Sequence, residues 1–137
     1  MAIVVGPTQW QFDVFTLPGT AYAGGTSICR SGGVIWIVAP VSTEVSRDWY
    51  SRADAATTAE ANAACGDWFV PTRPQLLNPG YACRNRWDQY SLTGYWGSED
   101  DLVPGNQAAT IRFDTGGTGA CHKSLISCAR AFRCVTY

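Results

Sequence analysis

The stretch Cys65-Gly-Asp-Trp-Phe-Val-Pro-Thr-Arg-Pro-Gln-Leu76 joins the strongest helix signal of the chain to a turn bounded by prolines. A short helix is expected to begin after Thr72, with Pro74 in its first turn, where proline is well tolerated. Pro79 is expected just beyond the end of that helix, because proline cannot continue one. The stretch therefore predicts a bend followed by a short helix.

A first helix is expected just upstream of this stretch. The segment Ala59 to Ala64 is rich in alanine and favours a helix, and Gly66 is a natural stop for it. Thr57-Thr-Ala-Glu60 matches a capping box, in which each side chain accepts a hydrogen bond from the other residue's backbone N–H. A helical start nearer Ser51 is the alternative.

Strands are expected on both sides of the helices. After Gly32-Gly33, the run Val34-Ile-Trp-Ile-Val38 holds five apolar β-formers, which predicts a strand covered on both faces. In the last segment of the chain, alternation places Phe132 and Cys134 on one face of a strand. Further strands are predicted at Ile3–Val5, Trp10–Val14, Thr110–Phe113 and Arg130–Tyr137. Strands combined with two short helices predict an α+β domain.

Composition places the chain among small domains with a single core. Of its 137 residues, 46% are hydrophobic and 15% are charged, and the net charge is −1. Without a basic cluster, a nucleic-acid partner is not expected. No apolar run approaches the roughly 18 residues that a membrane-spanning helix needs. Six Trp, six Tyr and five Phe indicate a core built from large rings.

The six cysteines are the second compositional signal. An even count in a small domain predicts disulfides, and zinc binding is disfavoured because there is no Cys-x-x-Cys and only one histidine. The N-terminal residues lack the features of a secretory signal. A virion protein satisfies both observations, because a phage is assembled in the cytoplasm and then released into an oxidising medium.

Five short motifs follow one another along the chain: a glycine pair, a Cys after a helix, Asp-Trp with a later Pro-Thr and Leu, Tyr-Trp with a Ser, and two arginines in the last strand. Their residues are Gly32, Gly33, Cys65, Asp67, Trp68, Pro71, Thr72, Leu76, Tyr95, Trp96, Ser98, Arg130 and Arg133. In this order they resemble the DUF1566 and Fibrobacter major-paralogous (Fib_succ_major) domains of bacterial surface and phage virion proteins.

The resemblance covers residues 29–137 and implies a C-type-lectin-like domain with small twisted antiparallel sheets, two short helices, long loops and stabilising disulfides. Residues 1–28 have no counterpart and are expected to be an N-terminal arm or strand segment that docks onto another protein. One position departs from the family pattern, because Gln75 stands where a Glu is usual. No enzymatic activity is implied.

The resemblance also implies roles for individual residues. Trp68, Trp96 and Pro71 are expected in the scaffold, with each buried indole N–H bonded to an acceptor. Arg130 and Arg133 are either solvated strand positions or ligand contacts. In C-type-lectin-like domains the first helix is tied to the last strand, and Cys65 and Cys134 occupy those places. Cys121 and Cys128 flank an expected hairpin tip, which leaves Cys29 with Cys83 by elimination.

The sequence offers little for catalysis. His122 directly follows Cys121, so the two side chains diverge on a strand and a Cys/His dyad is not expected. Motifs for a nucleophilic serine, a phosphate loop or a zinc protease are absent from the sequence. Calcium binding by Glu99, Asp100, Asp101 and Asn106 is the one cofactor alternative. Because the sugar-binding signatures of C-type lectins are absent, no cofactor is expected.

The remaining functional candidate is the irregular segment 87–106, since loops on a rigid scaffold commonly carry recognition. Its candidate binding residues are Trp87, Tyr90, Glu99, Asp100, Asp101 and Asn106. The sequence thus predicts a non-enzymatic phage tail or fibre component that binds a host-surface glycan or protein, or other virion proteins. A purely structural decoration or tail-assembly protein and a bacterial cell-surface adhesin are the alternatives. Self-association is left open.

Overall fold

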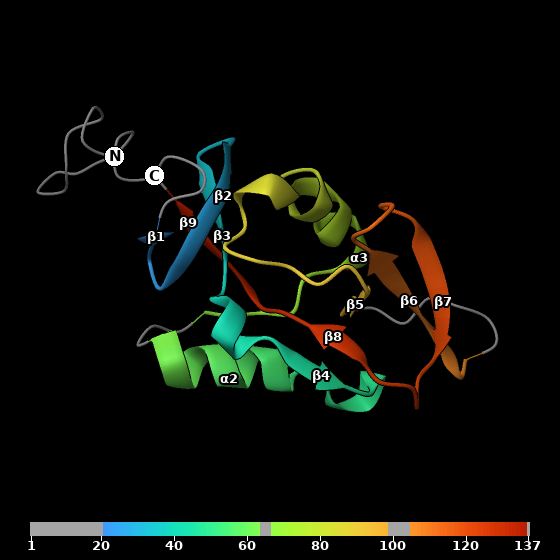
Figure 1. Ribbon diagram of the computed structural model, residues 1–137. Coiled ribbons are helices and arrows are strands. Elements are labelled where there is room, and N and C mark those ends of the chain that lie inside the picture. Colours follow the sequence, from blue (N-terminus) through green and yellow to red (C-terminus); the bar gives the residue numbers. More distant parts are fainter. Residues whose placement is uncertain (1–20, 64–66, 99–104, 137) are drawn as a thin grey trace, which may run out of the picture.

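The computed structural model describes residues 21–63, 67–98 and 105–136, which form a mixed α+β domain (Figure 1). The strands expected at Ile3–Val5 and Trp10–Val14 lie outside these residues. Short strands predominate, and helices flank them. The predicted α+β class is therefore confirmed at this level.

The described strands form two sheets. In the first, the order is β1-β2-β3-β9, and all pairs are antiparallel. Its strands are β1 Ala21–Tyr22, β2 Gly25–Ser31, β3 Val34–Val38 and β9 Phe132–Thr136. In the second sheet the order is β4-β8-β5-β6-β7, with β5 and β8 parallel. Its strands are β4 Val45–Arg47, β5 Gly94–Trp96, β6 Gln107–Arg112, β7 Thr118–His122 and β8 Ser127–Ala129.

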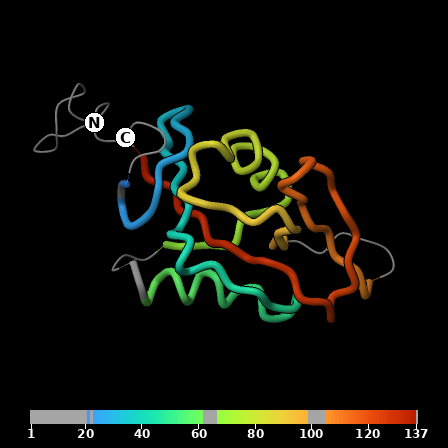
Figure 2. Tube along the Cα trace, in the orientation of Figure 1, coloured from blue at the N-terminus to red at the C-terminus, as the bar shows by residue number. Residues whose placement is uncertain are grey.

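One continuous segment joins the two sheets. Strand β8 belongs to the second sheet, and β9 follows it in the chain and belongs to the first. Figure 2 shows this segment in red, running through the middle of the molecule between α2 (Asp54–Ala63) and the segment formed by α3 (Arg73–Gln75) and η3 (Leu76–Tyr81). Side chains bear this out, because Ala131 packs with Ala59 of α2 and Phe132 with Leu76. Residues 129–132 are therefore covered from both sides.

The first helix, α2, spans Asp54–Ala63, so it begins before the predicted capping box. Thr57 lies inside the helix, and the capping-box prediction is wrong; the alternative start near Ser51 is closer. A 3₁₀ turn, η2 (Trp49–Ser51), precedes α2, and the Asp48 carboxylate accepts the Ser51 N–H at 3.0 Å. An Asp at this position satisfies a free N–H donor before the helix proper begins.

The second helix begins as predicted. Thr72 caps α3 (Arg73–Gln75), and the Gln75 side chain accepts the Thr72 N–H at 2.9 Å. Gln75 thus completes a capping box with the neutral counterpart of the expected Glu. Pro79 lies beyond the end of α3, as predicted, and a further helical turn, η3 (Leu76–Tyr81), contains it. Extended backbone at Asn78 separates α3 from the proline, as residues before proline favour.

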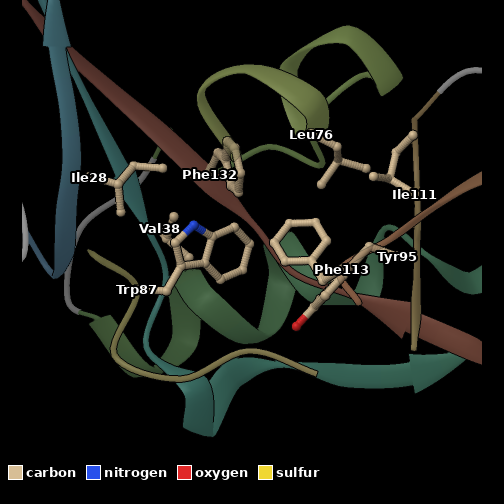
Figure 3. Packing of buried hydrophobic residues seen from close by; sticks show 8 residues of the cluster. All are labelled: Ile28, Val38, Leu76, Trp87, Tyr95, Ile111, Phe113 and Phe132. Atoms are coloured by element: carbon tan, nitrogen blue, oxygen red, sulfur yellow. The ribbon is translucent and has the colours of Figure 1, made fainter. Parts of the chain in front are cut away.

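Strand β3 is covered on both faces, which confirms the prediction from its apolar run. One face packs against α2 in what we call the alanine-lined cluster: Ile35, Ile37, Ala39, Ala59, Trp68 and Ala131. The other face meets the ring-rich cluster, drawn in Figure 3: Ile28, Val38, Leu76, Trp87, Tyr95, Ile111, Phe113 and Phe132. Two 3₁₀ turns lie between the other elements: η1 (Val41–Thr43) follows β3, and η4 (Arg84–Arg86) follows η3.

The predicted scaffold residues are buried. Trp68, Trp96 and Pro71 are all buried, and the Trp96 indole N–H donates to the Arg47 carbonyl at 2.8 Å. The Trp68 indole nitrogen is buried without a hydrogen-bond partner among the described residues. The expected acceptor is therefore found for Trp96 and not for Trp68.

Candidate functional site

The aromatic residues of the predicted recognition segment are in the core. Trp87 is only 6% exposed, and its indole N–H donates to the Gly80 carbonyl at 3.1 Å. Its ring lies 5.0 Å from that of Phe113, and the half-buried Tyr90 ring lies 5.5 Å from Phe113. The prediction that Trp87 is an exposed binding anchor is therefore wrong. The residues after η4 turn inward because the ring and its N–H are both satisfied there.

The polar candidates do not assemble into a described site. Glu99, Asp100 and Asp101 lie outside the described residues. Asn106 is exposed, and its carbonyl accepts the Lys123 N–H at 2.8 Å. Within the described part of the chain, no three His, Cys, Asp or Glu side chains are grouped so that they could hold a metal ion.

The most concentrated charge inside the described fold surrounds Arg130, whose side chain is fully buried. Its Nη2 lies 2.5 Å from Asp88 Oδ1, and its Nη1 lies 3.2 Å from Glu44 Oε1. The guanidinium also donates to the carbonyls of Ala39 and Gln89, at 2.7 Å each. A buried cation is tolerated only when it is paired and hydrogen-bonded in this way.

Tyr95 extends this group of charges. Its hydroxyl donates to Glu44 Oε1 at 2.5 Å and accepts the Ser91 N–H at 2.8 Å. Burial, and then the hydrogen bond and negative charge of Glu44, raise the pKa of the Tyr95 hydroxyl far above its ordinary value. We call Glu44, Asp88, Tyr95 and Arg130 the Arg130 cluster. It fastens the loop after η4 to the segment between β8 and β9, which is a structural role.

The two arginines of the last motif therefore differ. Arg130 is a buried structural cation, whereas the half-buried Arg133 donates to the Ala23 carbonyl at 3.1 Å. The reading of Arg130 as a solvated position is wrong. A sequence signal existed in the apolar neighbours Ala129, Ala131 and Phe132, which are all buried.

Exposed apolar side chains lie on two segments that a backbone hydrogen bond joins. Tyr50 in η2 is 65% exposed, and Leu125 and Ile126, in the turn between β7 and β8, are 56% and 66% exposed. The two segments are joined by the Trp49 N–H, which donates to the Lys123 carbonyl at 2.9 Å. We call Tyr50, Leu125 and Ile126 the Tyr50–Ile126 patch. Sequence reasoning missed it, although an apolar Leu-Ile pair between two serines in a turn was a usable signal.

The base of this patch is stiffened by cations stacked on a ring. Arg52 Cζ lies 3.6 Å from the centroid of the Trp49 ring, and Lys123 Nζ lies 4.3 Å from it. Arg52 also donates to the carbonyls of Trp49 and Ser98, at 2.7 and 2.8 Å. These contacts hold η2 against the neighbouring turn, so Tyr50 projects from a fixed backbone.

The described cysteines are thiols in this structure. Cys121 Sγ contacts the Thr110 hydroxyl at 3.8 Å, and Cys128 Sγ contacts the Thr93 hydroxyl at 3.6 Å. The structure does not bring Cys121 and Cys128 together, because β5 and β6 lie between β7 and β8 in the sheet. The predicted hairpin was therefore wrong. Cys65 lies outside the described residues, so the Cys65–Cys134 pairing stays a prediction.

Cys29 and Cys83 do lie together. Both pack against the ring-rich cluster, where burial and then the neighbouring Cys83 raise the pKa of the Cys29 thiol. His122 sits in an exposed local turn, where its Nδ1 lies 2.7 Å from the Ser124 hydroxyl oxygen. Such contacts between near neighbours are typical of turns and do not require catalysis.

A scan against protein-family models finds no match to the chain, and a search of curated proteins finds no significant match. Within the described residues, no helix has the length and apolar character needed to cross a membrane. The function must therefore be inferred from the residues and their geometry.

Proposed function

We propose that this chain is a non-enzymatic, C-type-lectin-like module of a phage virion, in a tail or fibre, which binds another virion protein through the Tyr50–Ile126 patch. The resemblance to DUF1566 and Fib_succ_major domains supports the virion setting. Burial of Trp68, Pro71, Leu76 and Trp96 supports the resemblance, since the motif residues are those that a packed scaffold needs.

The observation that carries the binding proposal is the exposure of Tyr50, Leu125 and Ile126 on held backbone. Loops positioned on a scaffold are common recognition sites. Two exposed aliphatic side chains and an exposed tyrosine on neighbouring segments suit an apolar protein surface, where such groups lose water on contact. Sugars are more often bound by flat rings with polar neighbours, so a protein partner is favoured.

The test is particle association. Virions released from cells that carry the gene are banded in a density gradient, and the protein is detected by immunoblot. We expect the wild-type protein to band with particles and the double variant Leu125→Ser with Ile126→Ser to lose this association. The matched control is Leu92→Ser, because Leu92 is 62% exposed and lies outside the patch.

Two outcomes would contradict the proposal in different ways. A wild-type protein found only in particle-free fractions would exclude the virion setting. A double variant that bands with particles at the wild-type level would exclude the patch as the contact surface. Thermal melts of all three proteins establish that the serine substitutions leave the fold intact, as expected for exposed positions.

A further inference from the structure

A strand irregularity helps to place two cysteines that are distant in the sequence on the same core cluster. The pairing of β2 with β3 shifts by one residue between Ser27 and Cys29, so Ile28 is an extra residue in β2. A bulge of this kind re-aims side chains. Ile28 and Cys29 are sequence neighbours, yet both contact the ring-rich cluster. The bulge therefore lets Cys29 pack on the cluster that Cys83, at the start of η4, also contacts.

The surroundings of the pair favour thiol chemistry. Cys29 and Cys83 both pack against the ring-rich cluster, and Arg86 Nη1 lies 3.9 Å from Cys83 Sγ. Burial and then the neighbouring Cys83 raise the pKa of the Cys29 thiol, and Arg86 lowers it. A guanidinium at this distance stabilises the negative charge that a sulfur carries when it attacks or leaves. Arg86 is exposed, so a small oxidant can approach from its side.

We propose that Cys29 and Cys83 form a reversible disulfide that fastens β2 to η4. Among the described cysteines, Cys29 and Cys83 are partly buried on the same cluster beside Arg86, whereas Cys121 and Cys128 each contact a threonine hydroxyl. A metal site is not favoured, because no third ligand of the usual kinds is grouped with the pair in the described residues.

The bridge has a structural consequence. The chain after η4 carries Trp87 and Asp88, which enter the ring-rich cluster and the Arg130 cluster. Fastening η4 to β2 therefore restrains the point at which this segment enters the core. The bridge is independent of the binding proposed for the Tyr50–Ile126 patch, which lies on η2 and the β7–β8 turn.

Oxidation can proceed by exchange with a small disulfide such as glutathione disulfide. The Cys83 thiolate attacks one sulfur of the glutathione disulfide, whose S–S bond breaks, and a glutathione thiolate leaves. The Cys29 thiol loses its proton to solvent and attacks the Cys83 sulfur of the mixed disulfide, releasing the second glutathione thiolate. Two protein thiols are oxidised and one glutathione disulfide is reduced to two thiols.

The experiment equilibrates the full chain in glutathione buffers from reducing to oxidising, quenches with acid, alkylates free thiols and maps the peptides by mass spectrometry. We expect a peptide linked through Cys29 and Cys83 in the oxidising buffer, and its loss in the reducing one. Cys83→Ser should leave Cys29 alkylated, whereas the control Cys121→Ser should keep the linked peptide. The oxidised wild-type protein should melt higher than the reduced one by roughly 5 °C.

The peptide map of the wild-type chain decides the question even if a variant fails to fold. Complete alkylation of Cys29 and Cys83 after equilibration in the oxidising buffer would overturn the proposal. A linkage of either residue to any other cysteine would overturn it as well.

Discussion

The two faces of the first sheet are packed in opposite ways. On one face, α2 approaches closely because the contact is lined with Ala59, Ala131 and Ala39 around the isoleucines of β3. On the other face there is no long helix, and rings fill the space between the sheet and the α3–η3 segment (Figure 3). Trp87 alone has ring centroids of Phe113, Phe132 and Tyr95 within 5.8 Å.

Because of this difference, the two faces should tolerate different substitutions. A close helix contact leaves no room for added atoms, so volume gained is the damaging change on the alanine-lined face. A face built from rings depends on their volume and on the polar anchors that hold them, so volume or an anchor lost is the damaging change there. Substitutions on each face can break or sharpen this comparison.

The largest effect is expected from the double substitution Trp87→Ala with Tyr90→Ala. Removal of the buried indole alone should lower the free energy of unfolding by about 3–5 kcal/mol, a large part of a typical domain's stability. We therefore expect the double variant to unfold at ambient temperature in a circular-dichroism melt. Tyr50→Ala is the control, because that ring is exposed. A double variant that melts within a few degrees of wild type would show that Trp87 and Tyr90 do not contribute to the core.

The next largest effect is expected from Arg130→Met, which leaves Asp88 and Glu44 without their buried cation. Breaking a buried ion pair in this way should cost about 3–5 kcal/mol in urea unfolding. The control is Arg112→Met, whose guanidinium pairs with Asp114 at the exposed surface, so its loss should cost far less stability. Equal losses in the two variants would show that the Arg130 cluster contributes no more than a surface pair.

A smaller effect, opposite in kind, is expected on the alanine-lined face. Ala59→Leu adds volume where α2 meets the sheet and should cost about 1–3 kcal/mol. Glu60→Leu is the matched control on the same helix, because Glu60 is exposed and its replacement should change stability by about 0.5 kcal/mol or less. Urea unfolding measures both. An unchanged or more stable Ala59→Leu protein would show that this face has spare room.

The smallest effect is expected on the pH dependence of the free energy of unfolding, through Tyr95 in the ring-rich cluster. Because the pKa of Tyr95 is raised in the folded protein, the unfolded chain loses this proton first as pH rises above about 10. The free energy of unfolding should then fall by about 1.4 kcal/mol per pH unit through this group, having been constant below that pH. Tyr95→Phe should remove this part of the slope in unfolding curves between pH 9 and 11. Tyr50→Phe should retain it, and equal slopes in both would contradict the assignment.

Local sequence signals were sufficient wherever near neighbours supply the stabilising contacts. Alternation and β-forming residues predicted β3 and the strand at the end of the chain, and Thr72 with Gln75 fixed the start of α3. The size and apolar character of Trp68 and Trp96 predicted their burial. The start of α2 was missed because Asp48 organises a 3₁₀ turn that leads into the helix.

Only the tertiary structure decided where Trp87, Arg130 and the cysteines lie and which groups they contact. Arg130 is held by acceptors 91, 86 and 42 positions away, so its apolar neighbours indicated burial but no local pattern identified the groups that pair with it. Cys29, beside a bulge, packs on the same cluster as Cys83, and Cys121 is kept from Cys128 by two intervening strands. By itself, the sequence determined the α+β class and several of its elements, because helix capping and side-chain alternation are local. Burial and charge pairing arise between distant segments, so they required the assembled fold.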